Sequence, residues 1–235
     1  MYRPINSNRL VIKQSDKLSF ASYSLSLVET KFLAFIIAQI DKDDSVFCEY
    51  EINKYDFETL INARLDYRTL KNFAKTLQSK VITLQNDEQE RFTTFNWFHH
   101  LSYENGIFKA QLHDYLKPLL LNFQTHFGKS SLLYIARMKK SQYTSRFYYM
   151  FCSYKAQYQN SFDIELTELY RILELKDSLT RYNDFKRKIL TSALEEINTI
   201  TDLETKYTES QKIGKKVTHL RFEFLNKEKN LLDFT

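Results

Sequence analysis

The stretch from Ser178 to Phe224 constrains the fold of this chain more than any other part. It begins with SLTRYNDFKRKILTSALEEINTI, where apolar residues recur at three- and four-residue steps, as in a helix that buries one face. We expect this helix to begin near Thr180. Lys186 falls close to the apolar stripe and can reach water only by snorkelling. The stripe consists of Tyr182, Phe185, Ile189, Ala193, Leu194 and Ile197, and the opposite side carries Arg181, Asp184, Arg187, Lys188 and Thr191.

Two strand-like segments follow the helix. In the first, Leu203, Thr205 and Tyr207 alternate with polar neighbours. Between the segments lies a short basic turn in which Gly214 can take a positive φ without steric cost. In the second segment, Val217, His219, Arg221 and Glu223 alternate with Leu220, Phe222 and Phe224, and the turn itself contains Lys212, Gly214, Lys215 and Lys216.

A helix followed by a hairpin with a cationic tip is the outline of a winged helix. In such a module the helix can enter a DNA major groove, about 12 Å wide, while the tip reaches the neighbouring backbone. The pattern therefore predicts a duplex DNA-binding module in the second half of the chain.

Several segments recur in order, type and spacing, which favours two copies of one module. YEINKYDF at 50–57 corresponds to FDIELTEL at 162–169, and Phe185 follows Phe73 by 112 residues. The tripeptide at 30–32 recurs at 145–147. With 235 residues the chain can hold two domains of roughly 100 to 150 residues each. We expect an N-terminal domain at 1–125 and a C-terminal domain at 126–235, joined in the polar stretch 122–129.

The first half shows further elements. Residues 1–17 read as a loose arm with a short strand at Leu10–Lys13. Leu27–Ile40 is too hydrophobic for a surface helix, so it is a core helix or an interface helix. A strand is expected at Val46–Glu51, followed by a helix at Ile52–Ile61 that Asn53 caps.

A second amphipathic helix and further strands complete the first half. The turn at 87–90 is acidic, so a first wing with this tip is poorly suited to phosphate. Strands flank a turn at Asn105-Gly106, and a helix around Pro118 closes the half. The amphipathic helix has the stripe Leu70, Phe73, Ala74, Leu77 and Val81, with Arg68, Asn72 and Lys75 pointing outward and Lys71 at the edge.

An aromatic stripe in the second half consists of Tyr143, Phe147, Tyr148 and Phe151. At helical spacing such a stripe indicates core packing more often than a platform for stacked bases.

Composition excludes some classes but does not by itself indicate nucleic acid. The net charge is only +5, from 34 Lys and Arg against 29 Asp and Glu. Nucleic-acid binding can therefore be inferred only from how the charges are arranged locally. No apolar run approaches the roughly 20 residues of a membrane span, and the start has no signal-peptide character. Cys48 and Cys152 lie in apolar surroundings, which predicts buried thiols in a reducing cytoplasm.

Enzymatic chemistry finds little support in the sequence. His99 and His100 are adjacent, whereas rolling-circle nickases separate two metal-binding histidines by one residue. Gly128-Lys129-Ser130 resembles the end of a phosphate-binding loop, but Phe123 stands where that loop needs a glycine. His113, His126 and His219 are isolated, which argues against zinc. We expect no enzyme activity, no metal and no cofactor.

Three motifs carry a resemblance to a known family. They are KKSQYTSRFYYM, YNDFKRKILTSALEEINTITDL and KIGKKVTHLRFEF. Because all three motifs occur in this order, the chain resembles the replication initiator (Rep) proteins of theta-replicating, iteron-bearing plasmids. The resemblance extends from about Asn6 to Phe224. The resemblance implies an α+β, helix-rich fold of two tandem winged-helix domains, the first serving dimerisation and auxiliary DNA contact and the second as the principal DNA reader. It also implies origin repeats as DNA targets, a homodimer in equilibrium with a monomer, and host replication proteins such as the replicative helicase or its loader.

The same resemblance implies DNA-contacting residues. Helical periodicity also favours two of them, Arg187 and Lys188, because both lie on the outward face of the helix. Arginine can in addition make two hydrogen bonds to guanine. The implied positions on the long helix are Arg181, Asn183, Lys186, Arg187 and Lys188, those of the second wing are Lys212, Lys215 and Lys216, and those of the first-half helix are Arg68, Lys71 and Lys75.

The expected function is sequence-specific binding of duplex DNA that initiates plasmid replication in the bacterial cytoplasm, with repression of the protein's own gene. Two alternatives stay open from sequence. One is a transcriptional repressor of the same fold, and the other is a DNA-nicking initiator of the rolling-circle kind.

Overall fold

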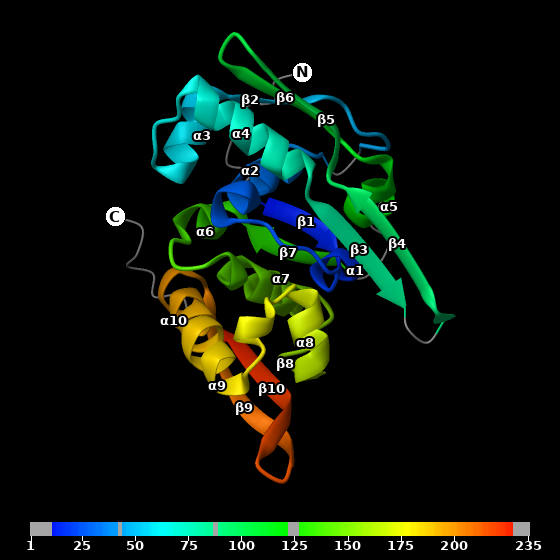
Figure 1. Cartoon of the computed structure of the whole chain (residues 1–235), viewed down its shortest axis with the longest axis vertical. Coiled ribbons are helices and arrows are strands. Elements are labelled where there is room, and N and C mark those ends of the chain that lie inside the picture. Colours follow the sequence, from blue (N-terminus) through cyan, green and yellow to red (C-terminus); the bar gives the residue numbers. More distant parts are fainter. Residues whose placement is uncertain (1–10, 42–43, 87–88, 122–126, 228–235) are drawn as a thin grey trace.

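The same series of elements occurs in both halves of the chain, as Figure 1 shows for the computed structural model. The structure describes residues 11–41, 44–86, 89–121 and 127–227. The first series is α2 (Leu27–Ile37), β2 (Tyr50–Asn53), α3 (Lys54–Ile61), α4 (Tyr67–Gln78), β5 (Phe98–Glu104) and β6 (Ile107–Leu112). The second is α7 (Gln142–Ala156), β8 (Ser161–Glu165), α8 (Leu166–Ile172), a long helix, β9 (Leu203–Ile213) and β10 (Lys216–Asn226).

The long helix runs without interruption from α9 (Tyr182–Phe185) through a π-helical turn (Lys186–Leu190) into α10 (Thr191–Ile200). It begins close to the predicted start at Thr180.

Strand order confirms the internal repeat. The first sheet has the order β2-β6-β5 and the second β8-β10-β9, and all pairs are antiparallel. In each half the strand that precedes two helices pairs with the last strand of the hairpin that follows them. Each half therefore has the helix, strand, helix, helix and hairpin arrangement of a winged helix, and the two hairpins lie at opposite ends of the molecule (Figure 1).

Other elements belong to one half only or join the two. β1 (Val11–Ser15) precedes α1 (Asp16–Ser19) and pairs antiparallel with β7 (Phe127–Ser131), which leads into α6 (Leu132–Arg137). The first half also contains the hairpin β3 (Val81–Asn86) and β4 (Arg91–Asn96), and it ends with a 3-10 turn (Asp114–Leu116) and α5 (Lys117–Leu120). A further 3-10 turn (Asp177–Leu179) precedes the long helix.

The strand pairing corrects the expected position of the first wing. The acidic turn at 87–90, expected at its tip, connects β3 to β4, a hairpin without a counterpart among the described residues of the second half. The hairpin equivalent to β9–β10 is β5–β6, whose turn contains Asn105 (φ 51°) and Gly106 (φ 80°), as predicted for this turn. Residues 87–88 lie outside the described part of the chain.

Local predictions elsewhere are confirmed in part, and the helix expected at Ile52–Ile61 begins only at Lys54. Asn53 caps α3 by accepting a hydrogen bond from the Tyr55 backbone N–H at 2.8 Å. The strand expected at Val46–Glu51 begins only at Tyr50. Val81, assigned to the apolar stripe of α4, begins β3 instead and is 42% exposed. The strand expected at Leu10–Lys13 appears as β1 and pairs with β7, so the expectation of a loose arm is wrong for residues 11–17, while residues 1–10 lie outside the described part.

Helix α2 settles the choice between a core helix and an interface helix. Every residue from Glu29 to Ile37 is buried, because α2 packs against α3, β2 and β1 of its own half and against α6 and α7. A capping box begins the helix, in which the Ser26 backbone N–H donates to Glu29 Oε2 at 2.6 Å. The hydrophobicity of α2 is therefore explained by the core of the chain itself.

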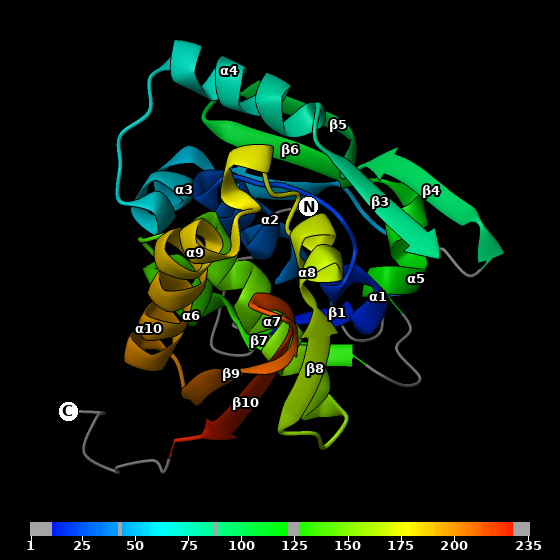
Figure 2. The ribbon, with the colours of Figure 1, turned by 60° about the horizontal axis from the view of Figure 1, so that its bottom comes forward.

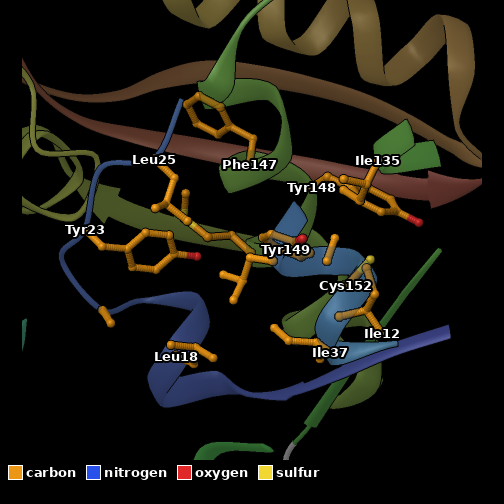
Figure 3. Close-up of a cluster of buried hydrophobic side chains, with 14 of the residues drawn as sticks. Ile12, Leu18, Tyr23, Leu25, Ile37, Ile135, Phe147, Tyr148, Tyr149 and Cys152 are labelled. Carbon is orange, nitrogen blue, oxygen red and sulfur yellow. The ribbon is translucent and has the colours of Figure 1, made fainter. Parts of the chain in front are cut away.

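One hydrophobic core extends across both halves. Figure 3 shows Ile12 and Ile37 close to Cys152 of α7. Each buried aliphatic or aromatic side chain of this size contributes about 1.5 to 3 kcal/mol to the stability of the fold. The aromatic stripe of α7 is core as predicted, with Phe151 5.1 Å from Phe224 between ring centres, whereas Cys48 is only partly buried.

Polar contacts also join the halves. Arg146 of α7 donates to the backbone oxygens of Ala21 at 2.5 Å and Ile172 at 3.1 Å, and its guanidinium lies 3.5 Å from the centre of the Tyr23 ring. The expected domain boundary at residues 125 and 126 stays a prediction, since residues 122–126 lie outside the described part. Within that part, no helix is both long and apolar enough to cross a membrane.

Candidate DNA interface

The long helix buries the stripe that the sequence predicted. Phe185, Ile189, Ala193 and Ile197 are at most 2% exposed, and they hold the helix on the core of the second half. Single π-helical turns often occur at functional sites, and here the turn contains the basic run Lys186 to Lys188. The outward face is therefore held in a defined orientation by its buried side.

Two cations on the outward face share one carboxylate. Arg187 Nη2 lies 3.2 Å from Asp184 Oδ1, and Lys188 Nζ lies 3.0 Å from the same oxygen. The hydrogen bonds from Lys188 and then Arg187 lower the pKa of Asp184. The side chains of Arg187 and Lys188 remain 75% and 47% exposed, so DNA can compete for them with a weak, solvated ion pair. Arg181 and Asn183 are also exposed, near the start of the helix.

Lys186 points toward the hairpin and differs in this from its neighbours. Its Nζ lies 3.1 Å from Glu209 Oε1 of β9, and 5.7 Å and 5.9 Å from the ring centres of Tyr182 and Tyr207. The predicted snorkelling path is confirmed, because the side chain crosses these rings and is 43% exposed. The structure thus separates Lys186 from the outward pair Arg187 and Lys188.

Glu209 lies at the centre of this contact, although no sequence motif indicated it. It accepts hydrogen bonds from the Tyr182 hydroxyl at 2.7 Å and from Lys186, and its Oε2 lies 2.7 Å from Lys212 Nζ. Hydrogen bonds from Lys212, Tyr182 and Lys186 lower the pKa of Glu209 to about 2. Alternation could have found it, since Glu209 continues the inward series Leu203, Thr205 and Tyr207 of the same strand.

The tip of the second hairpin is cationic and exposed. Gly214 has φ 60°, as predicted for the turn, and Lys212, Lys215 and Lys216 are all exposed. The register of β9 and β10 shifts between Val217 and Leu220. This bulge corrects the expected alternation, because it places Val217 on the same buried face as Leu220.

In the first half, α4 occupies the position that the long helix has in the second. Arg68, Lys71 and Lys75 are exposed, while Leu70 and Leu77 are buried. Lys71 and Lys75 line a groove of about 510 Å³ between α4 and β5, and Arg68 lies outside it. Figures 1 and 2 show α4 and the long helix in separate halves of the molecule.

The histidines contact different partners. The rings of His99 and His113 stack at 4.3 Å, and His100 Nε2 lies 3.0 Å from Glu49 Oε2. Burial, and then the nearby His99, lower the pKa of His113. Among the described residues, no three His, Cys, Asp or Glu side chains are grouped so as to hold a metal ion. His126 lies outside those residues.

Sequence and structure comparisons agree with this architecture. The family model described as "Initiator Replication protein, WH1" matches residues 11–152, and "Initiator Rep protein, WH2" matches residues 165–224. The fold is similar to that of the Pi initiator protein, solved in complex with iteron DNA, with 21% identity, a TM-score of 0.73, and coverage of 96% of this chain and 100% of that one. A structure of domains 2 and 3 of RctB is more distant, with 10% identity, a TM-score of 0.45, and coverage of 97% of this chain and 95% of that one. Because the two family models together cover most of the chain, it belongs to the initiator replication (Rep) protein family, with one WH1 and one WH2 winged-helix module.

Proposed function

We propose that this Rep protein binds repeated duplex sequences at a plasmid origin and initiates replication there. The observation that carries the proposal is the exposed pair Arg187 and Lys188, presented by a rigidly packed helix beside a hairpin with a lysine-rich tip. The Pi initiator protein, which has a similar fold, was solved with iteron DNA, and this supports repeated origin sequences as the target.

The second half supplies the principal reader. Arg187 and Lys188 contact base edges in the major groove, and Arg181 and Asn183 contribute near the start of the helix. Lys215 and Lys216 contact phosphates of the flanking backbone.

Lys186 and Lys212 have a different part in this proposal. Lys186 contacts Glu209 from the helix, so it helps to set the angle between the long helix and the wing, whereas Lys212 contacts Glu209 from within the same strand, β9. In the first half, Arg68, Lys71 and Lys75 of α4 make auxiliary contacts.

Family membership supports a proposal about assembly and partners. We propose a homodimer in equilibrium with a monomer, and recruitment of host replication proteins such as the replicative helicase or its loader, in the bacterial cytoplasm. We do not assign the dimer contact to residues Glu29 to Ile37 of α2, because they are buried in the core of the chain itself. The protein acts without catalysing a reaction on DNA.

Binding and replication assays test these statements separately. Fluorescence anisotropy at fixed salt compares origin fragments of the parent replicon with random duplexes, and footprinting locates the bound repeats. We expect tighter binding to the repeats and periodic protection. Equal affinity for both DNAs would contradict sequence-specific binding.

A second assay distinguishes the initiator from its alternatives. A marker plasmid that contains the origin should replicate only when this chain is supplied. Repeat binding without replication would leave a repressor of the same fold. Nicking of supercoiled origin DNA in the presence of a divalent metal would favour a rolling-circle initiator.

A further inference from the structure

A basic loop outside the predicted DNA-contacting set joins α6 to α7. Arg137 ends α6, and Lys139 and Lys140 follow before the cap residue Ser141. The side chains of Arg137, Lys139 and Lys140 are all exposed. Met138 between them is buried, which anchors the loop in the core.

The long helix holds the backbone of this loop. The backbone N–H groups of Lys139 and Lys140 donate to Glu196 Oε1 at 2.6 Å and 2.9 Å. The other carboxylate oxygen of Glu196 accepts from Thr144 Oγ1 at 2.7 Å. Glu196 is 5% exposed, so these hydrogen bonds are shielded from water and fix the loop beside α10.

The loop borders the same exposed strip of helix that carries Arg187. Lys140 Nζ lies 3.4 Å from Glu195 Oε2, and Glu195 is 61% exposed. Arg187, Thr191 and Glu195 follow one another at four-residue steps and are all exposed. Eight residues at a rise of 1.5 Å place Glu195 about 12 Å along the helix from Arg187. This is about the width of a major groove.

Positive charge is in excess at this place. The loop carries three exposed cations, of which Lys140 pairs with the exposed carboxylate of Glu195, while Glu196 is occupied by backbone N–H groups. Lys31 of α2 lies near the loop, and its pKa is lowered first by burial and then by the charge of Lys139. A surface with this imbalance fits a polyanion.

We infer that the Arg137–Lys140 loop is a second contact for the DNA phosphate backbone, at the end of the long helix opposite to the wing. The wing reaches the first turns of the helix through Glu209, which contacts Tyr182 and Lys186, and the loop reaches the last turns through Glu195. A helix in a major groove lies between two phosphate strands, and a cationic element at each end contacts one strand each. The inference rests on the proposed function, because it takes the long helix as the DNA reader.

The salt dependence of binding by the full-length chain tests the loop. We expect Lys139→Ala/Lys140→Ala to weaken binding to origin and random duplexes by the same factor. The slope of log K against log[KCl] should fall by roughly one to two, since each lost phosphate contact removes about 0.9. The control is Lys206→Ala, which removes an exposed lysine 2.8 Å from Glu223 on the strand face turned away from the long helix, and it should leave the slope unchanged. A slope unchanged in the double variant would overturn the inference.

A second variant separates DNA contact from packing. Glu195→Gln removes the carboxylate that competes with phosphate for Lys140, so it should tighten binding to both duplexes. Weaker binding by Glu195→Gln would overturn the inference. It would show that this variant and the double lysine variant both act by disturbing the packing of the loop. If the wild-type chain does not prefer origin repeats, the proposed function fails, while the slope on random duplex still decides whether the loop contacts DNA.

Discussion

Lys186 Nζ lies 3.1 Å from Glu209 Oε1, and this contact connects the long helix to the hairpin behind it. Tyr182 and Lys212 approach the same carboxylate, so one residue of β9 gathers two side chains of the helix and one of the wing. A lysine that the family resemblance implied as a DNA reader thus lies at a joint between two elements. The side chain of Glu209 is 23% exposed, while those of Lys186 and Lys212 are 43% and 48% exposed, so water partly screens this joint.

Replacing Glu209 should destabilise the fold and leave base preference unchanged. Glu209→Gln keeps the shape of the side chain but removes its charge, which leaves Lys186 and Lys212 without an anionic partner. We expect a stability loss of about 1 kcal/mol after allowance for solvent screening. Urea unfolding measures the stability, and selection from a random duplex pool measures base preference. Glu223→Gln on the other face of the hairpin is the control, and a changed base preference for Glu209→Gln would contradict a positioning role.

The same carboxylate predicts a pH dependence of stability. Its pKa is about 2 in the folded chain against an ordinary value of 4.5. A lowered folded pKa means that the stabilisation is present above pH 4.5 and is lost as the pH falls from about 4.5 toward about 2. The free energies of unfolding of wild type and Glu209→Gln should therefore differ at pH 6 and converge at pH 2. A difference that stays constant over this range would show that the Glu209 charge does not stabilise the fold.

Arg187→Ala tests base recognition. Loss of its guanidinium should weaken binding to the cognate repeat by about 1 to 3 kcal/mol and relax preference at one base pair. Anisotropy titrations with single-base variants of the repeat measure this. An equal loss of affinity for cognate and random DNA would indicate that Arg187 contacts phosphate and not a base.

Lys215→Ala should behave differently. Lys215 is exposed at the tip of the hairpin, where it can reach phosphates but not base edges under the long helix. Affinity should fall by the same factor for all sequences, and the salt slope should fall by about one unit. A loss confined to the cognate repeat would contradict the wing assignment.

Gly128→Ala tests the contact between β7 and α7. A Cβ atom at position 128 would lie 3.0 Å from the backbone nitrogen of Ser153, so the two elements would have to move apart. We expect a destabilisation of about 1 to 3 kcal/mol, measured by urea unfolding. A variant as stable as the wild type would show that the strand can shift without cost.

Much of each element could be predicted from local sequence. The stripe from Phe185 to Ile197, the Asn53 cap and the turn at Gly214 depend on residues within one or two turns of each other, and the structure shows all three. The errors concern pairing over longer distances. Val217 lies on the buried face because a bulge shifts the register of β10, and no local pattern marks that bulge.

The amino-acid sequence by itself determined the two copies of the module and the amphipathic helix and basic hairpin of the second copy. Hydrophobic periodicity and turn chemistry act between near neighbours, so they can be read from the chain directly. Only the tertiary structure decided that β5–β6 is the equivalent hairpin of the first copy, and that Lys186 faces Glu209 while Arg187 faces solvent. Strand register and the meeting of distant side chains depend on how whole elements pack, and that information is spread over the complete core.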